Sequence, residues 1–137
     1  IDLLYNDNYQ IFISGNSRDK NLLSDFLKKH RSKIVDITGK MTLSEFIAFI
    51  HSADALIAAS TGPLHIAAAL GKVAIGLYSP MRPIHPGRWG PVGERAHSLV
   101  INKKCNACRY SKYCECIRSI TPEEVIEILD AEMNQDK

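Results

Sequence analysis

A chain of 137 residues with 45% hydrophobic residues and a formal net charge of +2 can bury one core, and we expect residues 1–137 to form a single domain. The small charge argues against a nucleic-acid-binding protein, and the basic cluster at residues 28–33 closes a predicted helix, where cations suit the helix dipole. No apolar run approaches the roughly 20 residues that span a bilayer, and no signal peptide is visible, so we expect a cytoplasmic protein. The sequence starts at Ile1 without a Met, which suggests a fragment of a longer protein.

The first part of the chain predicts two strands and two helices. Residues 9–14 are an apolar run that ends at Gly15, Asn16 and Ser17, which indicates a strand and a turn. A helix is predicted over residues 19–30, with one buried face made of Leu22, Leu23, Phe26 and Leu27. Residues 34–37 form the second strand. The Thr-Leu-Ser-Glu sequence at 42–45 is a capping box, and it opens a helix whose apolar residues share a face: Leu43, Phe46, Ile47 and Ile50.

The rest of the chain continues this alternation. Strands are predicted at residues 54–58, 73–78 and 97–101, and a terminal helix at 122–133, opened by a second capping box at 121–124. Its apolar side carries Val125, Ile126, Ile128 and Leu129. Nearly all-apolar strands that alternate with helices are typical of a parallel sheet covered on both faces. The predicted fold class is therefore α/β, with a doubly wound parallel sheet.

A turn of small residues follows the strand at 54–58 and is suited to hold an anion. Ser60 or Thr61 can cap the next helix, Gly62 lets a ligand approach the backbone, and Pro63 suits the first helical position because its missing N–H would be unpaired there. Gly71 closes the helix. The free amides and the positive end of the helix dipole then face the carboxyl end of a strand, where α/β sheets bind ligands. The same pattern also occurs in α/β domains without a ligand.

Two further features carry groups that could meet a sugar or a phosphate. His65 lies four residues after Thr61 on the same helical face, so its ring can turn toward a bound anion or bond a neighbouring carbonyl instead. The Pro- and Gly-rich stretch at residues 79–93 is predicted to be a long loop, and such loops at the edge of a parallel sheet are often functional. Its cationic and aromatic residues are Arg82, His85, Arg88 and Trp89.

Four cysteines lie within residues 105–116, at Cys105, Cys108, Cys114 and Cys116. Four thiolates could hold a structural zinc ion, but the second pair has the spacing Cys-x-Cys, which is less typical of zinc sites than Cys-x-x-Cys. Free thiols are the alternative, and nothing indicates a catalytic cysteine.

Several of these segments resemble the C-terminal half of the heptosyltransferase family, glycosyltransferase family 9. The resemblance rests on residues 60–72 (STGPLHIAAALGK), 78–80 (YSP) and 88–93 (RWGPVG), and it extends back to Gly15 and forward to residues 120–125. These bacterial enzymes build the lipopolysaccharide core. The resemblance implies two Rossmann-like domains, the GT-B fold, and transfer with inversion at the anomeric carbon that needs no metal or other cofactor. It identifies this chain as the C-terminal, donor-binding domain.

The resemblance also implies roles for individual residues. The amides of Thr61 and Gly62 would hold the donor diphosphate with His65 beside it. The loop that contains Lys40 and Met41 would flank the base, and the stretch from Gly15 to Ser17 would lie near the ribose. The general base is expected in a missing N-terminal domain, so this chain would contain no catalytic residue and would not transfer sugar alone. The donor would be a nucleotide sugar, with ADP-heptose as a candidate, and the acceptor a glycolipid at the cytoplasmic face of the inner membrane.

Two departures from the family pattern bear on the sugar. Many members carry Asp where this sequence has Ser60, and some carry an acid at the position of Ser17. These departures weaken the case for heptose more than the case for a nucleotide-sugar donor. Two alternatives stay open: half of a nucleotide-sugar 2-epimerase-like enzyme, which the Arg88 loop and the cysteine tail fit poorly, and a non-catalytic flavodoxin-like binding module with a zinc-stabilised tail.

Overall fold

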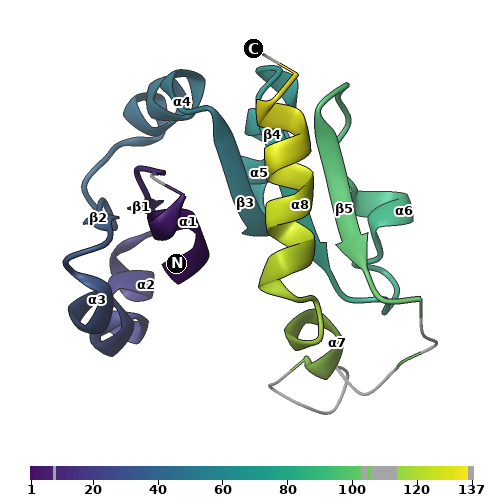
Figure 1. The fold of residues 1–137 in the computed structure, drawn as a ribbon, viewed down its shortest axis with the longest axis horizontal. Helices are drawn as coiled ribbons and strands as arrows, with labels where there is room; N and C mark the ends of the chain where they lie inside the picture. Colours follow the sequence, from purple (N-terminus) through teal and green to yellow (C-terminus); the bar gives the residue numbers. More distant parts are fainter. Residues whose placement is uncertain (8, 103–104, 106–113, 136–137) are drawn as a thin grey trace. The chain divides into compact units, whose positions relative to one another are not determined.

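The computed structural model describes residues 1–7, 9–102, 105 and 114–135 (Figure 1). The chain divides into two compact units, Ile1–Phe46 and Ile47–Lys137, and each is described here by itself. That residues 1–137 form one domain stays a prediction. Within the described residues, no helix is both long and apolar enough to cross a membrane.

The first unit is built on a pair of short parallel strands. Its elements in chain order are α1 (Asp2–Asn6), β1 (Phe12–Ile13), α2 (Ser17–Leu22), α3 (Ser24–His30) and β2 (Val35–Asp36). Phe12 pairs with Val35 and Ile13 with Asp36, and α2 and α3 form the connection that parallel strands require. The ladder continues past the strands, because the Gly39 N–H donates to the Gly15 carbonyl at 2.8 Å.

The helix predicted over residues 19–30 is wrong in its extent, since the structure forms two helices there. Asn16 and Asp19 make a reciprocal capping box that starts α2 at Ser17. The chain then turns at Leu23, where φ is −94° and ψ is 6°, before α3 begins. The break changes the helical phase, and Leu22, predicted to be buried, is 84% exposed.

The second unit contains a three-stranded parallel sheet in the order β3-β4-β5. The helix α4 (Leu43–Ser52) crosses the division between the units. The elements that follow are β3 (Ala55–Ala59), α5 (Gly62–Ala69), β4 (Val73–Tyr78), α6 (Pro86–Trp89), β5 (Ala96–Val100), α7 (Glu115–Arg118) and α8 (Pro122–Met133). Ala55 pairs with Val73, and Ala74 pairs with Ala96. The short helix α6 lies inside the stretch that was predicted to be a continuous loop.

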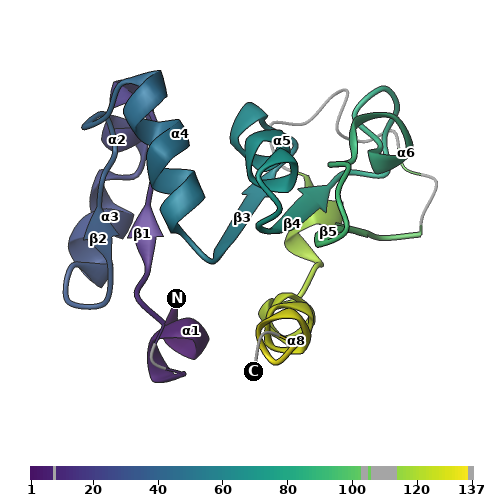
Figure 2. The ribbon, with the colours of Figure 1, turned by 90° about the horizontal axis from the view of Figure 1, so that it is seen from above.

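The strand β4 forms the centre of this unit. Figure 2 shows α5 and α8 on opposite faces of the sheet, and both helices contact β4. Val73, Ala74 and Ile75 are 0% exposed, as the apolar character of this strand on both faces requires. The predicted parallel sheet with helices on both faces is therefore present in this unit.

Both predicted capping boxes are confirmed. The Thr42 N–H donates to Glu45 Oε2 at 2.7 Å, and the Glu45 N–H donates to Thr42 Oγ1 at 3.3 Å. The Thr121 and Glu124 pair is arranged in the same way, and α8 has the predicted bounds. Of the four apolar residues assigned to one face of α4, Ile50 is buried and Leu43 is 69% exposed.

A partly buried polar cluster that the sequence did not indicate joins α8 to β5. Glu132 is 7% exposed, and its carboxylate accepts from Arg95 Nε at 2.9 Å and lies 2.7 Å from His97 Nε2. A second guanidinium nitrogen of Arg95 donates to the Glu132 carbonyl at 3.1 Å. The hydrogen bonds from Arg95, and then those from His97, hold the pKa of Glu132 below its ordinary value of 4.5.

We expect Gly76→Ala to destabilise the chain because α5 and β4 leave no room for a side chain. A Cβ at Gly76 would overlap the Tyr78 ring and lie 2.7 Å from Leu64 Cδ2, and both side chains are buried. Overpacking of this kind costs about 1–3 kcal/mol, measurable as a lower urea midpoint. As a control, Gly87→Ala lies outside this packing and should cost less. Equal midpoints for Gly76→Ala and the wild type would refute the tight packing.

We expect Glu132→Gln to reduce stability at pH 7 by about 1–3 kcal/mol, since a charged, hydrogen-bonded acceptor is lost. A carboxyl with a lowered pKa in the folded state stabilises the fold above its unfolded pKa, and this contribution disappears as the pH falls through the folded pKa. The free energy of unfolding should therefore fall on acidification below about pH 5 in the wild type, and less in Glu132→Gln. Glu127→Gln, on the exposed side of the same helix, should follow the wild type. If the free energy of unfolding changes with pH in the same way in all three proteins, Glu132 is not the carboxyl that stabilises the fold.

Candidate functional site

The predicted anion-binding turn lies between β3 and α5. Thr61 is the N-cap of α5 with an extended backbone (φ −133°, ψ 159°), and Pro63 lies in the first turn of the helix. The N-terminus of α5 therefore follows directly on the carboxyl end of β3, the position where parallel sheets place their ligands.

This helix N-terminus is not capped by a side chain. Thr61 makes no side-chain cap hydrogen bond, although α2 and α8 both begin with complete capping boxes. The expectation that Ser60 or Thr61 caps the helix with its hydroxyl is therefore wrong. Among the described residues, the backbone N–H of Gly62 has no acceptor, so a donor remains available at the positive end of the helix dipole.

The backbone at Gly62 is open. A Cβ built at Gly62 would meet no atom within 4 Å, and its φ is not in the left-handed region. Neither packing nor backbone geometry therefore requires glycine here. The missing side chain leaves the amide of the first helical turn accessible, which agrees with the predicted approach of a ligand.

The C-terminal end of α5 is capped by backbone hydrogen bonds. Gly71 has φ +71°, the Lys72 N–H donates to the Ala67 carbonyl, and the Gly71 N–H donates to the Ala68 carbonyl. This is a Schellman motif, and it confirms the predicted helix end. Leu64 and Ala67 are 0% exposed, so α5 is held by its buried face while its first turn stays open.

His65 lies in the first turns of α5 and is half-buried. Among the described residues no hydrogen bond to its ring is found, so the alternative in which it bonds a neighbouring carbonyl gains no support. Its role toward an anion stays a prediction.

Tyr78 at the end of β4 joins the turn to the loop that contains α6, and the sequence did not indicate this. Its side chain is 1% exposed, and its hydroxyl donates to the Trp89 carbonyl at 2.7 Å. Burial raises the pKa of Tyr78, and a hydrogen bond with the Ser60 side chain partly opposes that shift. The phenol therefore bonds Ser60, in the anion-binding turn, and Trp89, in the loop.

The loop presents a cation and an aromatic ring at its surface. Trp89 is 47% exposed, and the Arg88 guanidinium lies 5.8 Å from its ring centroid. Arg82 is exposed as well. His85 has a structural role, because it is the N-cap of α6 and its Nδ1 accepts from the Gly87 N–H at 3.0 Å.

The remaining predicted site residues belong to the first unit, at the carboxyl ends of β1 and β2. Gly15 accepts from Gly39, which has φ +67°, and Ser17 Oγ lies 3.0 Å from the place that a Cβ of Gly39 would occupy. Gly15 and Ser17 thus lie together against the turn after β2. Met41 is 36% exposed, and the Lys40 ammonium turns back to donate to the Asp36 carbonyl.

The cysteine prediction falls partly outside the described residues, because Cys108 lies there. Cys105, Cys114 and Cys116 are not in disulfides, and Cys116 is buried. Within the described part of the chain, no three His, Cys, Asp or Glu residues gather as a metal site. A zinc site with all four cysteines stays a hypothesis.

A sequence model of glycosyltransferase family 9 (heptosyltransferase) matches residues 1–116. The chain belongs to this family. Lipopolysaccharide heptosyltransferase 2 of Salmonella typhimurium is 22% identical over 141 residues, which cover 97% of this chain and 40% of that protein. Lipooligosaccharide heptosyltransferase 2 of Haemophilus influenzae is 24% identical, covering 94% of this chain and 39% of that protein. The family 9 chain thus spans about two fifths of the length of these relatives.

Two solved structures show the same fold. The structure of Escherichia coli ADP-heptose lipopolysaccharide heptosyltransferase II matches with a TM-score of 0.79 at 23% identity, over 98% of this chain and 39% of that one. A glycosyltransferase family 9 protein of Veillonella parvula matches with a TM-score of 0.79 at 20% identity and the same coverage. The family 9 chain therefore has the Rossmann-like α/β fold of half of a GT-B enzyme, as the sequence predicted.

We expect Tyr78→Phe to release the loop from β4. Loss of the phenol hydroxyl leaves the Trp89 carbonyl without its donor, which should cost about 1–2 kcal/mol. Trp89 is the only tryptophan of the sequence, so its fluorescence emission reports the change directly. Tyr5→Phe removes the hydroxyl of a tyrosine that is 45% exposed, and it should alter neither stability nor emission. Unchanged emission and stability in Tyr78→Phe would show that the hydroxyl does not hold the loop.

Proposed function

We propose that this chain is the nucleotide-sugar donor-binding part of an inverting glycosyltransferase of the heptosyltransferase type. The observation that carries the proposal is the N-terminus of α5, which is uncapped and open at Gly62. Membership of glycosyltransferase family 9 supports a sugar donor in preference to an unrelated anion. It also favours the transferase over an epimerase-like half or a flavodoxin-like module.

The chemistry of transfer explains the use of such a site. As the bond to the anomeric carbon breaks, the sugar gains oxocarbenium character and the departing diphosphate gains negative charge. Fixed amides and a helix dipole stabilise that growing charge more than they stabilise the ground state. In this proposal the amides of Thr61 and Gly62 bind the diphosphate, with His65 beside it.

The contacts with the nucleoside are assigned on the family resemblance, and those of the α6 loop on the kinds of side chain that it exposes. Gly15, Ser17, Lys40 and Met41 are proposed to contact the nucleoside. The exposed residues of the α6 loop, Arg82, Arg88 and Trp89, are proposed to meet the sugar or the acceptor, and the contact between the guanidinium and the indole suits a polyhydroxylated ring with attached phosphates.

The complete reaction requires more than this chain. A general base must remove the proton of the acceptor hydroxyl, and we propose that the remaining part of the protein supplies it. The relatives are named as heptosyltransferases of lipopolysaccharide or lipooligosaccharide, and one solved structure is named for ADP-heptose. We therefore propose a glycolipid acceptor, a place in lipopolysaccharide core or related glycan synthesis, and a peripheral location at the cytoplasmic face of the inner membrane. The chain alone should show no transfer activity.

A titration with ADP, UDP and GDP followed by NMR tests the proposal. One nucleotide should selectively shift the amides of Thr61 and Gly62, and that nucleotide names the base. Gly62→Val places a branched side chain in the open space and should weaken binding about tenfold or more, because diphosphate and side chain compete for one position.

The control is Ala69→Val, which adds a branched side chain at an exposed position near the far end of α5 and should leave binding unchanged. If both amides stay unshifted with all three nucleotides at millimolar concentration, in a folded sample, the donor-binding role is refuted. Equal affinity in Gly62→Val and Ala69→Val would place the nucleotide elsewhere.

A further inference from the structure

A hollow lies within the first unit, beside β2, and Lys40 is the one residue that it shares with the proposed donor site. It has a volume of about 610 Å³, within the range typical of small-molecule sites. The connection formed by α2 and α3 provides one wall, and the segment from Ile34 to Lys40 provides the other.

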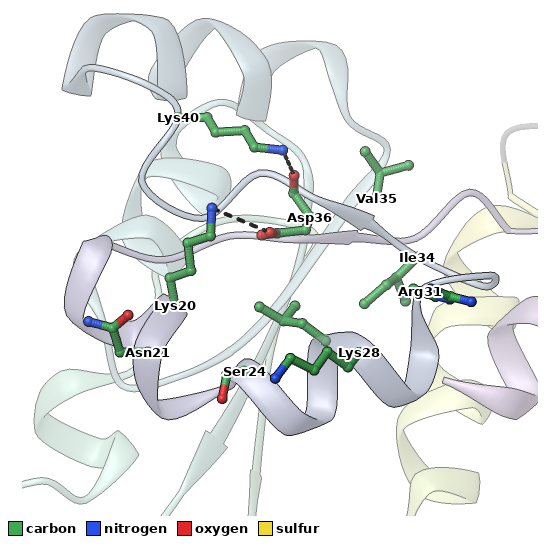
Figure 3. A pocket seen from close by; sticks show the side chains of 10 residues that line it. Lys20, Asn21, Ser24, Lys28, Arg31, Ile34, Val35, Asp36 and Lys40 are labelled. Atoms are coloured by element: carbon green, nitrogen blue, oxygen red, sulfur yellow. Dashed lines mark hydrogen bonds and ion pairs between the residues drawn. The ribbon is translucent and has the colours of Figure 1, made fainter.

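Most of the charge around this hollow is positive. Figure 3 shows the side chains that line it, which include four cations from different segments: Lys20, Lys28, Arg31 and Lys40. Lys20 is 4.0 Å from Asp36 and Lys28 is 4.0 Å from Asp25, whereas Arg31 has no ion pair among the described residues.

Asp36 is the one carboxylate in the lining, and it is already engaged. Its Oδ1 accepts from the N–H of Thr38 at 2.9 Å and from the hydroxyl of Thr38 at 2.5 Å, and Thr38 is 1% exposed. Lys40 donates to the backbone carbonyl of Asp36 and not to its carboxylate. The lining residues taken alone carry four positive charges and one negative charge, and Asp25, outside the lining, offsets part of this excess through its ion pair with Lys28.

The hollow also has an apolar part. Leu27, Ile34 and Val35 contribute to the lining, and Val35 is 41% exposed although it belongs to a strand. No aromatic ring is among the lining residues, so nothing there would stack on a nucleobase. Cations around an aliphatic surface suit a ligand with an anionic head and an aliphatic body.

We propose that this hollow binds a phosphate monoester with a short aliphatic chain. At neutral pH the phosphate carries close to two negative charges and three acceptor oxygens, which match the excess of cations better than a carboxylate does. The chain of the ligand lies against Leu27, Ile34 and Val35. A free alkyl phosphate and the headgroup region of phosphatidic acid share this chemistry.

The test is an NMR titration of the 137-residue chain with hexyl phosphate, inorganic phosphate and hexanol. Hexyl phosphate should shift the amides of Ser24, Arg31 and Asp36, with an affinity about tenfold above that of inorganic phosphate, since the alkyl chain removes apolar surface from water. Hexanol should shift none of these amides. Equal affinities for hexyl and inorganic phosphate, or shifts scattered over the surface, would overturn the proposal.

Two double variants of equal charge separate this site from general electrostatics. Lys28→Gln with Arg31→Gln removes one lysine and one arginine from the lining and should weaken hexyl phosphate binding about tenfold. Arg18→Gln with Lys29→Gln removes the same two residue types outside the lining and should have little effect. Equal losses in the two proteins would refute a defined site.

Vesicles of phosphatidylcholine, with and without phosphatidic acid, distinguish the two sources of the ligand. Binding of hexyl phosphate from solution supports a soluble ligand. Binding only to vesicles that contain phosphatidic acid, lost in Lys28→Gln with Arg31→Gln, supports the lipid headgroup. If the chain binds neither hexyl phosphate nor vesicles that contain phosphatidic acid, the proposal is overturned. This result does not depend on whether ADP, UDP or GDP shifts the amides of Thr61 and Gly62. The present inference and the donor-binding proposal are therefore tested separately.

Discussion

The packing of α5 against β4 over Gly76 is the constraint on which the site depends. The close approach buries Leu64 and Tyr78, and it fixes the direction in which α5 leaves the carboxyl end of β3. The open first turn of α5 can point its backbone donor at a ligand only because the rest of the helix is held. The same contact places Tyr78 where its hydroxyl can reach the α6 loop. Rigidity of this kind reduces the reorganisation that binding an anion would otherwise require.

Local sequence patterns predicted much of the fold. The boxes at Thr42 and Thr121 and the glycine at position 71 are signals that act within five residues, and the structure confirms them. The break between α2 and α3 was missed because apolar spacing alone was considered. The Asn16 and Asp19 pair, which has capping-box spacing, was a signal that could have corrected the start of α2. No local pattern marks the turn at Leu23.

The site was predicted less completely because its decisive contacts join residues far apart in the chain. Ser60 was one of two candidates for the cap of α5, yet its side chain interacts with Tyr78, 18 positions later in the sequence. His85 was expected to meet a ligand, yet one ring nitrogen caps α6. The cluster of Arg95, His97 and Glu132 also depends on tertiary packing. Residue type and spacing identify groups able to bind a ligand, but only the fold decides which of them are already engaged.

The Tyr78 hydroxyl has one proton, and the Trp89 carbonyl receives it. Any neighbour that bonds the phenol oxygen at the same time must therefore supply a hydrogen of its own. A serine at position 60 can do so, whereas an ionised aspartate in its place could only accept. Aspartate at this position would compete with the Trp89 carbonyl for the phenol proton and weaken the attachment of the loop.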